Sequence, residues 1–213
     1  MNYKKIAKDN YKKFAFIDGN QHIASEYALI TILKLIEDFN VKSILEVGLG
    51  IGSISDTVFK YAKINNKVID YAGTEANDFC LQALKSNVDD YNAIDLYDAI
   101  ADVKQDKKYD FIIVDGSDAS LKQIAAFCNS NTIIFVEGYR GSQVDSLKEI
   151  FPNYKHVEIA SSYKNPKYGP FPSENWSGGG QLIFTNPNFY RKIYWFKEKV
   201  NSFLNRRLRK FKK

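Results

Sequence analysis

The sequence predicts an α/β fold: a doubly wound sheet of seven strands, five parallel strands plus a terminal antiparallel pair, followed by an amphipathic C-terminal helix. Short apolar runs rich in β-branched residues alternate with segments of helical period, and the last two runs are joined by a Pro- and Gly-rich loop with no helical pattern. Of the 213 residues, 45% are hydrophobic and 26% charged, which excludes a disordered or collagen-like chain.

The elements follow one another in a regular order. Apolar side chains at helical spacing predict a helix over 23–37 that covers the sheet before the first strand. The loop of about 161–180 contains no helix, so the two strands that flank it should pair antiparallel. The strand candidates are 43–47, 68–74, 93–97, 109–114, 132–136, 156–160 and 181–185, and the helices between or after the first five are about 53–64, 78–87, 119–128 and 142–150.

Positive charge is concentrated at the end of the chain. The net charge is +5, but Arg191–Lys213 carries ten Lys and Arg against one acid, Glu198, so the rest of the chain is mildly acidic. An acidic body is not typical of a nucleic-acid-binding surface. We find no repeat and no boundary before about residue 187, which predicts one domain over 1–187 and a basic amphipathic helix over 188–213.

Cysteine usage and hydropathy indicate the compartment. Cys80 and Cys128 lie in separate apolar stretches, so we expect reduced, buried thiols rather than a disulfide framework or a zinc site. The start lacks an apolar signal segment, and no window of about 18 apolar residues occurs. We therefore expect a cytoplasmic protein that does not span a membrane.

The most informative segment is Glu46–Gly52, which reads EVGLGIG and joins the first strand to a helix. Gly48, Gly50 and Gly52 let the backbone turn sharply and approach a ligand without a Cβ in the way. The segment lies at the carboxyl end of a strand, where open α/β sheets bind nucleotides. A simple strand-to-helix turn would need only one or two of these glycines.

Polar positions after the first three strands extend this pattern. The carboxylate of Glu46 ends the first strand, where it can attract a cationic amino group. Glu75 follows the second strand and is placed to hold both hydroxyls of a ribose. Asp98 and Ala99 follow the third strand, where a side chain and the backbone could meet an adenine edge. Together they predict a ligand with an adenine, a ribose and a cationic amino-acid end.

This combination resembles the class I S-adenosylmethionine-dependent methyltransferases over about residues 23–186, in strand order as well as in motifs. The resemblance implies a Rossmann-like sheet and S-adenosyl-L-methionine as methyl donor, with Glu46 and the three glycines at the methionine moiety. It also implies that Glu75 binds the ribose, that Asp98 and Ala99 flank the adenine, and that Val114–Gly116 lies beside the transferred methyl. The run YDFIIVDG at 109–116 looks most like small-molecule O-methyltransferases, including branches that modify sugars and polyketides.

A dinucleotide-binding domain is the main competing interpretation. Its fingerprint, G-x-G-x-x-G, tolerates Ser53 at the last position. In that case Glu46 would share the crevice with a pyrophosphate, and Gly52 would be superfluous. The pattern therefore favours a methyl-donor site over an NAD site.

Transfer of a methyl to an alcohol requires that a base or a metal help to remove the hydroxyl proton. The candidate bases are Asp115 and Asp118 after the fourth strand and His22 before the first helix, although Asp118 could instead cap a helix. Asp115 and Glu137 could together hold a divalent cation. Acids after the fourth and fifth strands hold a metal in some related O-methyltransferases. Those enzymes normally have Asp-Asn or Asp-Asp where this sequence has Glu137-Gly138, so the metal requirement stays open.

Two C-terminal features bear on the acceptor and on partners. The loop before the last strand carries Tyr163, Tyr168, Phe171 and Trp176, which suit stacking on a sugar or aromatic ring but could equally complete the core. From Asn188 onward, apolar residues step by three or four and Lys or Arg fill the other face, which predicts a cationic amphipathic helix. This helix could lie on an anionic membrane at its inner face, dock on the body or on a partner subunit, or contact RNA.

The leading hypothesis is therefore an enzyme that methylates a hydroxyl of a small molecule or of a cell-envelope sugar. A non-catalytic binding module of the same fold at a membrane surface and an RNA methyltransferase are the alternatives. The sequence leaves the acceptor and the oligomeric state open.

Overall fold

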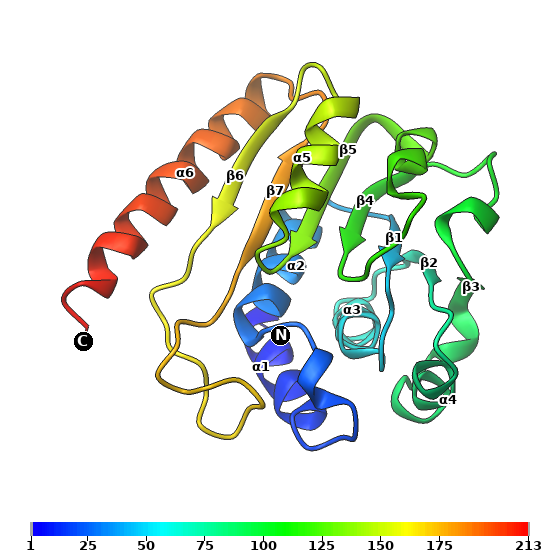
Figure 1. Cartoon of the computed structure of the whole chain (residues 1–213), viewed down its shortest axis with the longest axis horizontal. Coiled ribbons are helices and arrows are strands. Elements are labelled where there is room, and N and C mark those ends of the chain that lie inside the picture. Colours follow the sequence, from blue (N-terminus) through cyan, green and yellow to red (C-terminus); the bar gives the residue numbers. More distant parts are fainter. Residues whose placement is uncertain (1, 213) are drawn as a thin grey trace.

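The computed structural model describes residues 2–212 and is built on a seven-stranded sheet in the order β3-β2-β1-β4-β5-β7-β6 (Figure 1). The strands β1 to β5 pair in parallel with their neighbours, and β7 lies antiparallel between β5 and β6. The seven predicted strands and the antiparallel final pair are confirmed. The strands are β1 (Ser43–Val47), β2 (Asp70–Thr74), β3 (Ile94–Tyr97), β4 (Tyr109–Val114), β5 (Cys128–Glu137), β6 (Lys155–Ile159) and β7 (Gly180–Phe184).

The helices lie on both sides of this sheet. The α-helices are α1 (Tyr3–Phe14), α2 (Glu26–Asp38), α3 (Ser53–Ile64), α4 (Asp78–Asn87), α5 (Gly141–Ile150) and α6 (Phe189–Arg209). Short 3-10 helices are η1 (Asn20–His22), η2 (Tyr91–Ala93), η3 (Ile100–Asp102) and η4 (Leu121–Phe127). The helices α2 to α6 agree with the sequence prediction to within a few residues at their ends.

The segment 119–128, expected as an α-helix, is instead the 3-10 helix η4. Its buried side chains Leu121, Ile124 and Phe127 are spaced every three residues. With three residues per turn they lie on one face and pack together, whereas an α-helix would rotate them apart. The chain then enters β5 at Cys128, earlier than the predicted start at residue 132.

Both faces of the sheet are buried, as a doubly wound fold requires. Neighbouring residues of a strand point to opposite faces. Ile44 and Phe111 therefore pack in the core cluster that contains α1, α2 and α3, whereas Leu45 and Ile112 pack with η4 and α5. This two-sided burial explains why the central strands read as continuous apolar runs rather than as alternating patterns.

The helix α1 was not predicted from the sequence. The side chain of Asn2 caps it by accepting from the amide of Lys4, and Ile6, Tyr11 and Phe14 are buried on one face. Many lysines surround these few apolar positions, and they masked the helical period. The helix packs on α2 and α3 and covers the N-terminal half of α3, which begins at the glycine loop.

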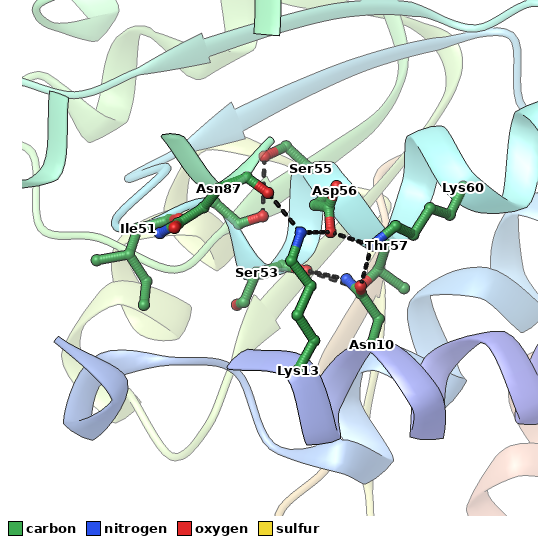
Figure 2. Close-up of polar contacts among 10 residues, drawn as sticks. Asn10, Lys13, Ile51, Ser53, Ser55, Asp56, Thr57, Lys60 and Asn87 are labelled. Atoms are coloured by element: carbon green, nitrogen blue, oxygen red, sulfur yellow. Dashed lines mark hydrogen bonds and ion pairs between the residues drawn. The ribbon is translucent and has the colours of Figure 1, made fainter. Parts of the chain in front are cut away.

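A buried polar network holds α1 against α3 (Figure 2). The carboxylate of Asp56, 1% exposed, accepts from Lys13 at 2.9 Å and from Lys60 at 2.7 Å. Asn10 donates to the hydroxyl of Thr57 at 2.7 Å. Since a buried carboxylate is stable only when it is paired, these bonds fix the register of the two helices.

The long helix α6 runs beside the edge strand β6 (Figure 1). Tyr194 is buried, and the indole nitrogen of Trp195 donates to the carbonyl of His156 in β6 at 2.7 Å. The division into a domain over 1–187 and a separate helix stays a prediction. Lys213, which was counted in the basic segment, lies outside the described residues. Within residues 2–212 we find no helix with the length and apolar character needed to cross a bilayer.

Candidate active site

A crevice of about 590 Å³ opens where β1, β2, β4 and β5 end. Its walls come from η1 and the start of α2, the glycine loop, the residues that follow these strands, and the loop between β6 and β7. A volume of this size is typical of small-molecule sites, which span about 300–1,000 Å³. The sheet therefore places a cavity at the edge that the sequence had indicated.

The glycine loop is shaped by close backbone contacts. Gly48 has a φ of +87°, and a Cβ there would lie 2.4 Å from the Cα of Gly116 after β4. Gly52 has a φ of +92°, and its Cβ would lie 2.4 Å from Val88 at the end of α4. Gly50 faces open space. Gly48 and Gly50 therefore line the crevice, whereas Gly52 lies outside it and lets α3 and α4 pack closely.

Glu75 lines the crevice at the end of β2 and is fastened by backbone amides. One carboxylate oxygen accepts from Gly50 at 2.8 Å, and the other accepts from Ala76 at 2.9 Å and Asn77 at 2.8 Å. A carboxylate has about four acceptor sites, so these bonds leave capacity for a further donor. The side chain is thus held at the crevice wall beside the glycine loop, ready to accept from a hydroxyl.

Glu46 lies beneath the loop and is not among the residues that line the crevice. Its side chain is 0% exposed, one oxygen accepts from the hydroxyl of Tyr71, and the other has no partner in the described chain. Burial raises the pKa of Glu46 from its ordinary 4.5 to about 8, against the opposing effect of the Tyr71 hydrogen bond. A contact between Glu46 and a ligand amino group stays a prediction.

Asp115 and Glu137 meet at the ends of β4 and β5 and both line the crevice. Arg140 donates to the Asp115 carbonyl at 2.5 Å and lies 3.3 Å from its carboxylate, while the amide of Ser25 lies 3.3 Å from a Glu137 oxygen. Burial, then the charges of Glu137 and Glu46, raise the pKa of Asp115 well above its usual range.

Burial raises the pKa of Glu137 as well, while bonds from Ser25 and from Asp115 lower it. Both carboxyl groups of the pair therefore have a raised pKa, chiefly because they are buried. The sequence had proposed Asp115 as a candidate base, and a catalytic role for Asp115 stays a prediction.

These residues are a poor donor set for a divalent cation. The guanidinium of Arg140 already occupies one side of Asp115, and the raised pKa values of Asp115 and Glu137 oppose the ionised state that a metal ligand needs. Across residues 2–212, no group of three or more His, Cys, Asp or Glu side chains is arranged to hold an ion. We assign no step of the reaction to a metal.

Three other predicted residues lie outside the crevice. The carboxylate of Asp118 accepts from the amides of Ile100 at 2.9 Å and Ser120 at 2.6 Å, so it joins the loops after β3 and β4. Asp98 is exposed, and the amide of Ala99 donates to Asp102 at 3.2 Å. A catalytic role for Asp118 and an adenine contact for Asp98 and Ala99 stay predictions.

The remaining wall is formed by residues far apart in the sequence. His22, the third predicted base, lines the crevice from η1. Phe171 and Trp176 line it from the loop between β6 and β7, whereas Tyr163 packs against Tyr27 instead. Cys80 also reaches the crevice and is half-buried, unlike the fully buried thiol that the sequence suggested.

Comparison with solved structures shows the same fold in several methyltransferases. An O-methyltransferase from Bacillus cereus in complex with SAH has a TM-score of 0.58 at 12% identity, over 84% of this chain and 90% of that one. A putative O-methyltransferase from Klebsiella pneumoniae has a TM-score of 0.53 at 14% identity, over 88% and 91%. The O-methyltransferase TomG from Streptomyces achromogenes, involved in tomaymycin synthesis and in complex with SAM, has a TM-score of 0.52 at 12% identity, over 86% and 89%.

No protein-family model matches the chain, and no curated protein sequence matches it significantly. The structural similarity confirms the Rossmann-like fold of the class I S-adenosylmethionine-dependent methyltransferases that the sequence resembled.

Proposed function

We propose that this protein is an S-adenosylmethionine-dependent O-methyltransferase. The observation that carries the proposal is Glu75, which three backbone amides hold at the wall of the crevice beside Gly50. A carboxylate at the end of β2, next to a glycine loop after β1, suits a ligand with ribose hydroxyls.

The residues of the crevice suit the parts of this donor. When bound, S-adenosylmethionine supplies a methyl group on a sulfonium, which is a strong electrophile. Glu75 accepts from the ribose hydroxyls, and the open backbone at Gly48 and Gly50 borders the methionine portion. We further propose that Glu46, buried beneath the glycine loop, attracts the ammonium group, and that Asp98 and Ala99, which lie outside the crevice, border the adenine.

The acceptor must lose a proton as its oxygen attacks the methyl. The pair of Asp115 and Glu137 is the group best placed to receive it, because both side chains line the crevice at the ends of β4 and β5. Arg140 positions Asp115 through its carbonyl and its carboxylate. His22 is the competing base, since it lines the same crevice from η1.

We propose a hydroxyl of a small molecule or a sugar as the acceptor. Phe171 and Trp176 present aromatic surfaces at the crevice, and such surfaces stack on the apolar face of a sugar or on an aromatic ring. We also propose that the enzyme works at the inner face of a membrane, on a glycan carried there, because the segment 188–213 is cationic and exposes apolar side chains.

Calorimetry of the full chain with S-adenosylmethionine, S-adenosylhomocysteine and NAD tests the donor. We expect both sulfur nucleotides to bind and NAD not to bind. Glu75→Gln should weaken donor binding at least about tenfold, because it removes the charge from the group that accepts from the ribose. Glu149→Gln, at an exposed acid of a surface ion pair, is the matched control and should bind as the wild type does. Binding of NAD alone would overturn the proposal.

A second experiment separates an enzyme from a binding module. Formation of S-adenosylhomocysteine is followed by mass spectrometry with a panel of catechols, sugars and lipid-linked glycans, and with RNA. We expect turnover with a small-molecule or glycan hydroxyl, and we expect Asp115→Asn to abolish it without loss of donor binding. Donor binding without turnover on any acceptor would indicate a binding module, and turnover on RNA alone would indicate an RNA methyltransferase.

A further inference from the structure

The helix α6 is fastened to the body through its polar face. The residues of α6 that are buried or half-buried step by three or four along one side, and most of them are polar: Arg191, Tyr194, Trp195, Glu198, Asn201, Ser202, Asn205 and Arg209. An amphipathic helix on a globular protein normally turns its apolar side inward. In this protein the arrangement is reversed.

Specific hydrogen bonds hold this polar face in place. The hydroxyl of Ser202, 3% exposed, accepts from the amide of Ala160 at 3.1 Å, and Asn205 donates to the carbonyl of Ala160 at 2.8 Å. Arg209 donates to the carbonyl of Ser161 at 2.8 Å, and Arg206 pairs with Glu158 at 2.7 Å. These bonds satisfy backbone groups at the end of β6, so the orientation of the helix is defined by the body itself.

The opposite face of α6 is apolar and exposed. At 100° per residue, the apolar side chains of the sequence pattern fall on one stripe, which we call the outer stripe. None of them packs into the core, and their exposed fractions run from 40% for Val200 to 79% for Phe189 within the helix. The outer stripe consists of Phe189, Ile193, Phe196, Val200 and Phe203, whereas Leu204 and Leu208 lie at its border and line a groove between α6 and the helices α1 and α2. A contiguous patch of this kind on a folded protein indicates a binding surface.

Cationic side chains flank the outer stripe. One side of the stripe is bordered by Lys192, Lys199 and Lys210. The other side is bordered by Lys197, and Arg207 lies within the stripe. All five side chains are exposed. The partner of this surface must therefore be apolar where it meets the stripe and anionic along both borders.

We propose that the outer stripe and its flanking cations form a docking surface for an anionic lipid bilayer, with α6 lying in the plane of the interface. The apolar side chains enter the boundary between headgroups and acyl chains, and the lysines meet the anionic headgroups. A second copy of the chain would bring two cationic helices together, and their repulsion disfavours it. This inference gives a structural basis to the proposed membrane location and does not depend on methyl transfer.

The geometry also relates the bilayer to the crevice. The C-terminal end of α6 reaches the loop between β6 and β7, where Lys212 donates to the carbonyl of Ser162 at 3.1 Å and Arg209 lies over the ring of Trp176 (Figure 1). Trp176 lines the crevice. The polar face of α6 therefore contacts the wall that we assign to the acceptor, and the helix lies between that wall and a bilayer bound to the outer stripe.

Flotation of the full chain with vesicles tests the proposal. We expect binding to vesicles of phosphatidylcholine with phosphatidylglycerol, weak binding to phosphatidylcholine alone, and a decrease with salt. The Phe196→Asp/Phe203→Asp variant should lose binding. The matched control is Phe16→Asp/Val68→Asp, which makes the same change at two exposed apolar side chains elsewhere and should bind as the wild type does.

A second set of variants tests the charges. Replacing Lys192, Lys199 and Lys210 with Gln should weaken partition into anionic vesicles about a hundredfold, since each lysine near the surface contributes about a factor of five. Replacing three exposed lysines away from α6, Lys63, Lys85 and Lys104, gives the same change in net charge and should leave partition largely unchanged. Calorimetry with S-adenosylmethionine on every variant reports separately on the fold and on the donor site.

The proposal is overturned if the wild type does not float with anionic vesicles, or if the stripe variant floats as well as its control. It is also overturned if light scattering shows a dimer in solution that the stripe variant converts to a monomer, because the stripe would then bind a second copy. If the Phe196→Asp/Phe203→Asp variant and its control, Phe16→Asp/Val68→Asp, both lose vesicle binding, the loss is due to the added negative charge. That result would also overturn the proposal that the outer stripe binds the bilayer.

Discussion

Replacing Glu46 with glutamine should stabilise the protein, by an amount that depends on pH. Glu46 is fully buried, and one of its oxygens has no partner in the described chain. Burial raises its pKa from 4.5 to about 8, so the folded protein keeps the group protonated at pH 7 while the unfolded chain ionises it. The wild type must therefore take up a proton to fold at neutral pH, and a neutral glutamine removes this requirement.

The size of the effect follows from the two pKa values. Each pH unit between the ordinary pKa and the working pH costs about 1.4 kcal/mol, so holding Glu46 protonated at pH 7 costs roughly 3 kcal/mol. Because the pKa is raised in the folded state, this cost is absent below pH 4.5, grows as the pH rises, and levels off above about pH 8. In a chain of this length, 3 kcal/mol corresponds to roughly 6–12 °C in melting temperature.

Urea denaturation of the wild type and of Glu46→Gln at pH 4.5, 6, 7 and 8 measures this difference. The Tyr71 hydroxyl keeps an oxygen acceptor in the variant, while the amide nitrogen that replaces the unpaired oxygen adds a cost that is the same at every pH, so the pH dependence of the difference isolates the charge. Glu149→Gln, at an exposed position, serves as the control and should show no such pH dependence. The reasoning would be refuted if the difference in the free energy of unfolding between the two proteins did not change from pH 4.5 to 8. It would also be refuted if the wild type became more stable relative to the variant as the pH rises.

Three further perturbations test other parts of the structure. Binding of S-adenosylmethionine at pH 7 should release a proton, because a cationic group near Glu46 favours the ionised form of its carboxyl group. Calorimetry in buffers of different ionisation enthalpy detects the released proton. Identical heats of binding in these buffers would contradict the proposed contact. Asp56→Asn should lower the free energy of unfolding by about 2 kcal/mol in urea, since Lys13 and Lys60 lose their buried partner. Arg140→Gln should move the acidic limb of the pH profile of the methyl-transfer rate to higher pH, because Arg140 lowers the pKa of Asp115 and the variant lacks this positive charge. An unchanged acidic limb would assign proton removal to another group.

The sequence allowed the fold to be predicted because each central strand is a continuous apolar run, and because the glycine loop marks the end of the first one. The loop from 161 to 180 correctly predicted the antiparallel final pair. The helix α1 was missed because the lysines around Ile6, Tyr11 and Phe14 hide its apolar face. The helix η4 was misassigned because a spacing of three also occurs along the apolar face of an α-helix, and seven residues are too few for the sequence alone to distinguish the two helices.

The predicted residues that line the crevice lie mostly at strand ends, together with His22 before the first helix and with Phe171 and Trp176 in the long loop. Glu75, Asp115 and Glu137 follow strands directly, and the sheet brings them to one edge. The contribution of Trp176 depends on how a long loop folds back, and no local pattern in the sequence specifies that path. Burial decides the protonation of Glu46, and burial is a property of the packed structure rather than of the motif.

The position of β7 has a consequence for how the chain matures. This strand follows β5 and β6 in the chain, yet it lies between them in the sheet, and all five of its residues are buried. Until residues 180–184 are available, β5 is an open sheet edge, and neither β6 nor α6 has a place on the body. The wall that carries Phe171 and Trp176 is tethered at both ends to this late pair of strands. A nascent chain can thus assemble the donor half of the crevice first and acquires the acceptor wall, together with the outer surface of α6, only after β7 has been synthesised.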